Sequence, residues 1–133
     1  MSWITWDESQ ITGHAGMDHG HQELVKLINQ LANAMQLGKP REVCSGTLNQ
    51  FVDLMRTHFL AEEQLMDRYR YPKAKEHKAL HSMLVRDVLA FKASYDSGAT
   101  AEFITLLVIL DSWLERDINS ADKALARFVA ARA

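Results

Sequence analysis

The sequence predicts an all-α protein, an antiparallel up-down-up-down four-helix bundle with an N-terminal arm and a short C-terminal helix. Of its 133 residues, 47% are hydrophobic and 24% are charged, which suits a packed core. Turn residues are sparse, with six glycines and two prolines, and they lack the regular spacing of about 8–12 residues that marks all-β domains. Apolar residues instead recur at steps of three and four in four long stretches joined by short connections.

The first helix is expected after a polar arm over residues 2–16. Its apolar stripe consists of Leu24, Leu27, Ile28, Leu31 and Met35. Gly38, Lys39 and Pro40 end this stripe, and because proline is favoured in the first turn of a helix, the second helix should begin there. Its stripe runs from Phe51 to Tyr69 and stops at Tyr71–Pro72.

The third stripe runs from His77 to Tyr95 and ends near Gly98, and the fourth runs from Phe103 to Asp117. A last segment with Leu125, Phe128 and Val129 predicts the short C-terminal helix. The sequence contains no internal repeat and no low-complexity tract, and nothing in it marks a second domain. Residues 1–133 are therefore interpreted as a single domain.

Charge and cysteine content exclude several classes of protein. Fifteen basic and 17 acidic residues give a net charge of −2, which argues against nucleic-acid partners. The longest apolar run, 106–110, is far shorter than the roughly 20 residues that cross a bilayer, so no membrane partner is expected. The single cysteine, Cys44, cannot form an internal disulfide or a thiolate cage, which fits a cytoplasmic protein.

Several ionisable residues fall on the apolar stripes. They are His21, His58, Glu62, His77, His81 and Asp117, and a further carboxylate, Asp122, follows Asp117 by five residues. His58 and Glu62 are four residues apart, as are His77 and His81, so each pair shares one helix face. Burying such groups without partners costs several kcal/mol. Imidazoles combined with carboxylates bind iron, zinc or manganese, so a metal site would compensate this cost.

A single buried histidine is more often hydrogen-bonded than metal-bound. Two histidine-bearing pairs on separate helices, with a further histidine and carboxylates on the other two, are hard to satisfy by hydrogen bonds alone. The set as a whole therefore favours a metal centre. By contrast, Glu23, Glu63 and Asp67 are expected to face solvent.

Four segments carry a family resemblance. They are MDHGH (17–21), HFLAEEQLM (58–66), YPKAKEHKALH (71–81) and WLERDINSAD (113–122). Together they resemble the bacterial hemerythrins, or bacteriohemerythrins, which are oxygen-binding proteins with a non-haem di-iron centre. The resemblance covers nearly the whole chain and implies two iron ions, in the Fe2+ or Fe3+ state, with a bridging oxo or hydroxo group.

The resemblance also implies roles for six residues. His21 and His58 would bind one iron, His77 and His81 the other, and Glu62 and Asp122 would bridge both. In the family, oxygen binds at the iron that has only two histidines, which here would be the one held by His21 and His58, and no enzymatic turnover is required.

The chain departs from the family pattern at Asp117, where the family has a fifth histidine, and no histidine follows His81. A carboxylate on the core face needs a charged partner, so we expect Asp117 to be a metal ligand, directly or through a water molecule. An anionic oxygen donor favours ferric over ferrous iron, so the oxygenated state should be shorter-lived than with five histidines.

Four further side chains, Phe59, Trp113, Leu114 and Ile118, neighbour the expected ligands and should wall an apolar oxygen pocket. The sequence thus predicts a protein that binds dioxygen, or another small diatomic or anionic ligand, for storage, delivery or sensing. The alternative is a di-iron oxidase or peroxidase, or a redox sensor, with an easily oxidised centre. The sequence identifies no protein partner.

Overall fold

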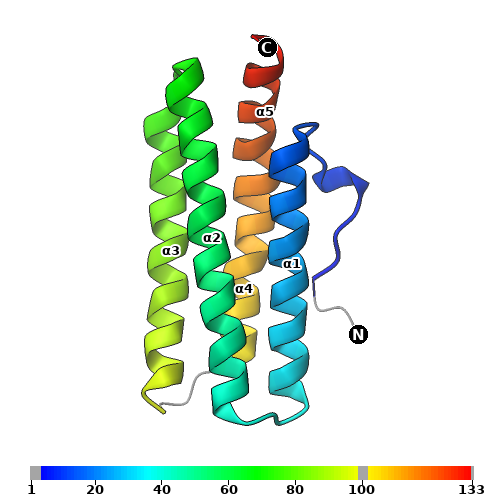
Figure 1. Ribbon diagram of the computed structural model, residues 1–133, viewed down its shortest axis with the longest axis vertical. Helices are drawn as coiled ribbons and strands as arrows, with labels where there is room; N and C mark the ends of the chain where they lie inside the picture. Colours follow the sequence, from blue (N-terminus) through cyan, green and yellow to red (C-terminus); the bar gives the residue numbers. More distant parts are fainter. Residues whose placement is uncertain (1–3, 99–101, 133) are drawn as a thin grey trace.

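A computed structural model of the chain describes residues 4–98 and 102–132, and these form the predicted antiparallel four-helix bundle (Figure 1). Its helices are α1 (Ala15–Gln36), α2 (Arg41–Tyr69), α3 (Ala74–Asp96), α4 (Phe103–Trp113) and α5 (Lys123–Ala130). A π-helical segment, Leu114–Asp122, joins α4 to α5, and a short 3₁₀ turn, Glu8–Gln10, lies in the N-terminal arm.

The ends of the first two helices follow from local chemistry. At the start of α1, the ring nitrogen Nδ1 of His14 accepts a hydrogen bond from the backbone N–H of Met17 at 3.2 Å. This bond satisfies one of the amides that the first turn leaves free. The α2 helix ends at Arg70, whose backbone is left-handed with φ 53°, and Pro72 follows closely.

The N-terminal arm lies along the outside of α1 (Figure 1). The backbone N–H of Ile4 donates to Oδ1 of Asn29 at 2.9 Å, and Nδ2 of Asn29 donates back to the Ile4 carbonyl at 2.8 Å. At the other end of the arm, the backbone N–H and hydroxyl of Thr12 both donate to Asp18 at 2.8 Å. The arm is therefore fastened to α1 at two points, with Trp6 between them.

The bundle has four helical columns: α1, α2, α3, and a fourth that consists of α4, the π-helical segment and α5. Sequence periodicity predicts ordinary α-helix in the fourth column, but its middle segment is the wider π-helix. Residues five apart on an α-helix point about 140° away from each other, whereas in a π-helix they stack on one face. Asp117 and Asp122 are five apart, lie in the π-helical segment and are both buried. The junction residues Leu114 and Lys123 keep helical backbone angles. The expected C-terminal helix is thus present as α5, but it continues the column without a turn.

The core consists of two apolar clusters. The larger one joins all four helical columns and includes Leu24, Leu48, Leu84 and Leu110. The smaller one lies toward the other end of the bundle and includes Met17, Met66, Tyr71, Leu125, Ala126 and Val129. Every helical column also contains buried polar residues, and these lie where the two apolar clusters meet. Together they form a polar layer inside the bundle. Within the described ranges, no helix is long and apolar enough to cross a membrane.

The larger cluster provides a test of the packing. Leu48 on α2 is fully buried in it, so replacing Leu48 by alanine should lower the free energy of unfolding by about 2–5 kcal/mol. The control is Leu60→Ala on the same helix, where the side chain is 58% exposed and the loss should be much smaller. Urea denaturation of both variants measures the difference, and equal losses would show that this part of α2 is not packed as described.

Candidate metal centre

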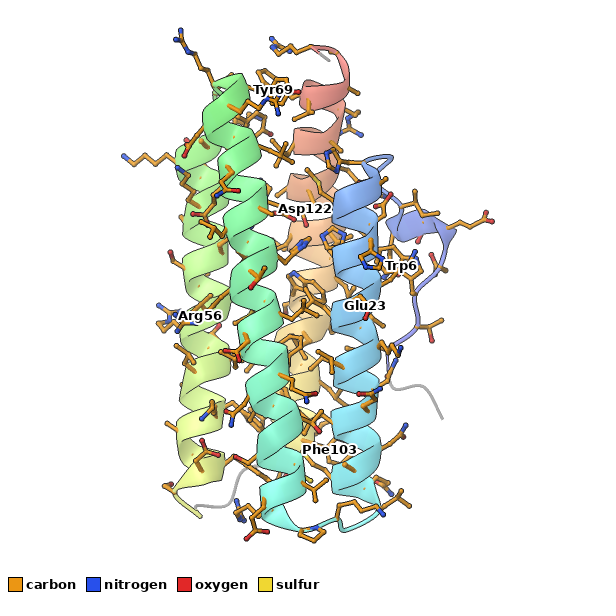
Figure 2. All side chains as sticks on the ribbon, viewed as in Figure 1. Trp6, Glu23, Arg56, Tyr69, Phe103 and Asp122 are labelled. Atoms are coloured by element: carbon orange, nitrogen blue, oxygen red, sulfur yellow. The ribbon has the colours of Figure 1, made fainter. Side chains whose placement is uncertain are left out.

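The polar layer contains all seven residues that the sequence indicates as candidate metal ligands. His21, His58, Glu62, His77, His81, Asp117 and Asp122 are each at most 7% exposed. They come from all four helical columns, and Asp122 points into the interior between the helices (Figure 2). The prediction that each column contributes an inward ionisable side chain at one level of the bundle is therefore correct.

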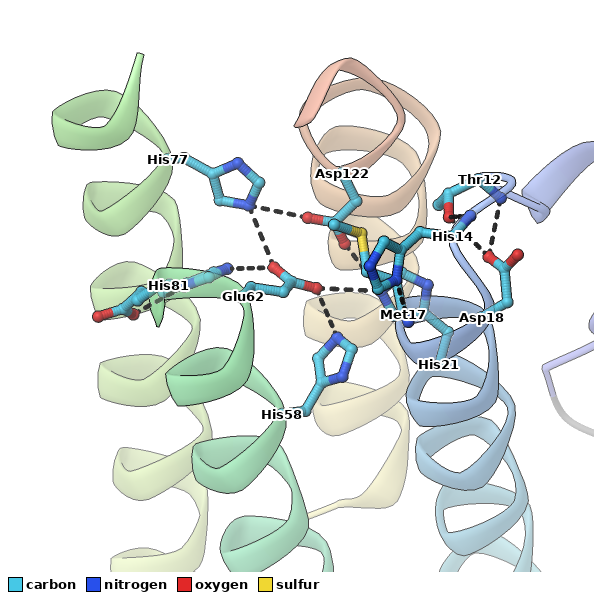
Figure 3. Close-up of polar contacts among 11 residues, drawn as sticks. Thr12, His14, Met17, Asp18, His21, His58, Glu62, His77, His81 and Asp122 are labelled. Carbon is cyan, nitrogen blue, oxygen red and sulfur yellow. Dashed lines mark hydrogen bonds and ion pairs between the residues drawn. The ribbon is translucent and has the colours of Figure 1, made fainter. Parts of the chain in front are cut away.

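Glu62 lies at the middle of this layer and divides its two oxygens between two pairs of histidines (Figure 3). Its Oε2 lies 2.6 Å from Nε2 of His58 and 3.4 Å from Nε2 of His21. Its Oε1 lies 2.9 Å from Nε2 of His81 and 3.3 Å from Nε2 of His77. Each oxygen of one carboxylate thus faces a separate pair of imidazoles.

Asp122, on the fourth column, likewise directs each of its two oxygens at a different group of histidines. Its Oδ2 lies 2.9 Å from Nε2 of His21, and its Oδ1 lies 2.8 Å from Nε2 of His77. The donor atoms form two groups, each within 4.8 Å, and both groups contain Glu62 and Asp122. His21 and His58 complete one group, and His77 and His81 complete the other. The arrangement suits two neighbouring cations that share two carboxylates.

Most of these short contacts are not hydrogen bonds. Nε2 of His21, His58 and His77 is buried and has no hydrogen-bond partner among the described residues, although carboxylate oxygens lie within 3 Å. Both oxygens of Asp122 are likewise unpartnered. These atoms approach one another without the alignment that a hydrogen bond requires. Such an arrangement is typical of ligands directed at a common ion, so the residues fit a metal.

The close contacts also shift the pKa values of these groups in the metal-free chain. Burial lowers the pKa of His21 and of His77, but the carboxylates of Asp122 and Glu62 outweigh it and raise both pKa values to about 9. Burial raises the pKa of Glu62, while its four histidine neighbours hold it well below the usual value. The carboxylate of Glu62 is therefore ionised, as a metal ligand must be.

Glu63 takes part in the centre, contrary to the expectation that it faces solvent. Its Oε2 lies 2.9 Å from Nδ1 of His81, the ring nitrogen opposite the one that faces Glu62. A carboxylate at this nitrogen fixes the orientation of a metal-binding imidazole and increases its basicity. Glu63 lies one turn beyond Phe59, whose ring stacks on His81 at a centroid distance of 3.9 Å, so both side chains of α2 contact this imidazole.

Comparison with known proteins agrees with this geometry. The profile of the Hemerythrin HHE cation binding domain matches residues 12–129. The chain belongs to the hemerythrin family. The matched region includes all seven buried polar residues of the centre.

Relatives named as hemerythrins match most of the chain. Bacteriohemerythrin of Pseudomonas aeruginosa PAO1 is 29% identical over 122 residues, which are 92% of this chain and 78% of that protein. The Hemerythrin-like protein of Naegleria gruberi is 30% identical over 120 residues, 90% of this chain and 87% of that protein. Myohemerythrin-1 of Phascolopsis gouldii is 28% identical over 117 residues, 88% of this chain and 87% of that protein.

Solved structures agree on the fold. A crystal structure of a hemerythrin point mutant superposes with a TM-score of 0.89 and 22% identity, and the match covers 98% of this chain and 99% of that one. A second mutant structure gives a TM-score of 0.88 and 23% identity over the same shares of the two chains.

Asp117, which the sequence predicts to be a metal ligand, is buried beside the centre. Its Oδ1 accepts a hydrogen bond from Nε of Arg116 at 3.3 Å, and its Oδ2 is buried without a partner among the described residues. Burial and the charge of Asp122 raise the pKa of Asp117 to about 6, against the opposing effect of Arg116. Its oxygens lie outside both groups of donor atoms, so the structure does not place it as a direct ligand.

The four predicted pocket residues are buried on the side of the larger apolar cluster, where Phe59, Trp113, Leu114 and Ile118 pack together. The Trp113 ring meets His21 edge-on at 6.1 Å. A hollow of about 250 Å³ reaches the centre from a different side, between α1 and α2. His58 and Glu62 line it together with Gly16, Met17, Ala61 and Leu65.

The contact between Glu63 and His81 leads to a testable expectation. Glu63→Ala removes the partner of Nδ1, so metal affinity should fall by about 10–100-fold while the fold is kept. The control is Asp67→Ala, which removes an exposed carboxylate that pairs with Lys78 on the same pair of helices. Competition with a chromophoric chelator measures both affinities. If the two variants bound metal alike, Glu63 would have no role in positioning His81.

Proposed function

We propose that this protein is a non-haem di-iron oxygen-binding protein that stores, delivers or senses dioxygen. The observation that carries this proposal is the division of the oxygens of Glu62 and of Asp122 between two groups of histidines. In this assignment His21 and His58 hold one iron ion, and His77 and His81 hold the other. Membership of the hemerythrin family supports the same assignment.

The residues around the centre provide its chemical environment. When bound, the two iron ions supply the electrons that dioxygen draws on, in a centre completed by an oxo or hydroxo bridge. Glu62 and Asp122 neutralise part of the cationic charge and hold the two positions together. Phe59, Trp113 and Ile118 exclude water and protons from the side of the larger cluster.

Access to the centre favours a small ligand. The hollow that reaches His58 and Glu62 is lined mainly by small or apolar groups, such as Gly16, Ala61 and Leu65. A hollow of about 250 Å³ accommodates a diatomic molecule or a small anion but few larger substrates. The ligand class that this centre best suits is therefore dioxygen or a molecule of similar size.

Asp117 favours a second candidate function, that of a di-iron oxidase or peroxidase, or of a redox sensor. Because its oxygens lie outside both groups of donor atoms, we assign it a link to iron through a water molecule. A third buried carboxylate beside the centre stabilises the ferric state relative to the ferrous state. Such a centre would be oxidised more readily than one with a fifth histidine.

The same proposal places the protein in the cytoplasm. Its only cysteine, Cys44, is a free and buried thiol, which is compatible with a reducing compartment.

The test of oxygen binding is the visible absorption of iron-loaded protein that has been reduced anaerobically and then exposed to oxygen. We expect a charge-transfer band that appears with oxygen and disappears on deoxygenation. The metal content, measured on the same sample, should be two iron ions per chain. Direct passage to a stable ferric spectrum, with no reversible band, would replace the carrier function with the oxidase or sensor function.

The role of Asp117 is tested by Asp117→His, which removes an anionic oxygen and restores the histidine of the family pattern. We expect the oxygenated spectrum to decay at least about fivefold more slowly, because a unit charge beside the centre contributes on the order of 1 kcal/mol or more. Asp111→His, at an exposed position on α4, is the matched control and should leave the decay unchanged. An Asp117→His variant that decays as fast as the parent would contradict this role.

A further inference from the structure

Gly20 lies where α1 passes closest to the ring of His58. A Cβ atom built on Gly20 would lie 2.2 Å from Nδ1 and 2.8 Å from Cε1 of that ring. Ordinary van der Waals contacts begin near 3.4 Å, so no side chain fits at position 20 while His58 keeps its place. The imidazole therefore lies directly against the backbone of α1.

The other contacts of His58 confine its ring on the side of the centre, whereas another side of it borders the hollow between α1 and α2. Its Nε2 lies 2.6 Å from Oε2 of Glu62, and its ring meets that of His21 edge-on at a centroid distance of 4.6 Å. The ring of Phe59 lies 6.0 Å away. A group added at Gly20 would displace the imidazole, either toward these neighbours or into the hollow that His58 lines, and either movement takes Nε2 away from Oε2 of Glu62.

Glycine in the interior of a helix is otherwise unfavourable. Gly20 lies within α1 and is not at a position that needs a left-handed backbone, so alanine would be the better helix former there. The conformation of the helix does not require glycine at this position. The closeness of the His58 ring does require it.

We propose that Gly20 is a positioning residue of the centre, because the absence of a side chain there sets the position of His58. The two sides of the centre would then orient their histidines differently. Glu63 holds His81 through a contact with Nδ1, whereas Nδ1 of His58 faces the space that a side chain at Gly20 would fill. This inference rests on the proposed role of His58 as a metal ligand.

A side chain at position 20 should disturb one metal position more than the other. To regain ordinary contact, the ring would have to move by about 1 Å, which exceeds the roughly 0.5 Å that a preorganised site tolerates. We expect Gly20→Ala to bind one Fe2+ per chain as tightly as the parent and the second at least tenfold more weakly. Anaerobic titration with Fe2+ against a chromophoric chelator measures both affinities.

The control is Gly46→Ala on α2, where a Cβ atom would meet nothing within 4 Å. This variant should bind two Fe2+ as the parent does, and its melting temperature without metal should rise because alanine favours the helix. Gly20→Ala should show no such rise. In a His58→Ala background the obstructing ring is gone, so Gly20→Ala should then raise the melting temperature as Gly46→Ala does.

The outcomes separate this inference from the proposed function. If the parent protein does not bind two Fe2+, the proposed function fails, and the melting temperatures of the metal-free variants still decide whether Gly20 accommodates His58. If the parent binds two Fe2+ and Gly20→Ala binds both equally tightly, Gly20 does not position His58. A rise in melting temperature for Gly20→Ala with His58 present would also overturn the inference.

Discussion

The structure depends on one constraint, the burial of a layer of imidazoles and carboxylates whose polar atoms do not satisfy one another. Unpaired polar atoms in a dry interior are costly, and many of the atoms in this layer lack hydrogen bonds. Apolar clusters pack on both sides of the layer, so most of these atoms are shielded from solvent. Two cations would convert this unfavourable layer into the strongest link between the four helical columns.

The two metal positions have similar ligand atoms, but different residues hold those ligands in place. Each side has two histidines and shares the same two carboxylates. His81 is held by Glu63, and His58 lies against Gly20. Asp117 adds a third buried carboxylate without joining either group of donor atoms. Differences in behaviour between the two metal positions would therefore arise from these surroundings more than from the ligands themselves.

Periodicity was sufficient to predict the bundle and the inward residues, because a core-facing stripe reports which side chains are buried. It was not sufficient for Glu63, which follows Glu62 by one residue and so points about 100° away from the core stripe. Its side chain nevertheless reaches His81 on the neighbouring helix. The closeness of Gly20 to His58 depends on the separation of α1 and α2, which a single sequence does not reveal. Neither contact has a local signature.

The π-helical segment Leu114–Asp122 has a consequence for how this chain tolerates change in length. A wider turn acts as a built-in insertion of one residue, and each residue in a regular helix rotates the chain by about 100°. Loss of a single residue here would return the segment to regular α-helix, so Leu125 and Val129 would keep their places in the smaller apolar cluster while the spacing of Asp117 and Asp122 changed. The fourth column is thus the part of the bundle best able to absorb a single deletion, and the cost of that deletion would fall on the polar layer and not on the smaller apolar cluster.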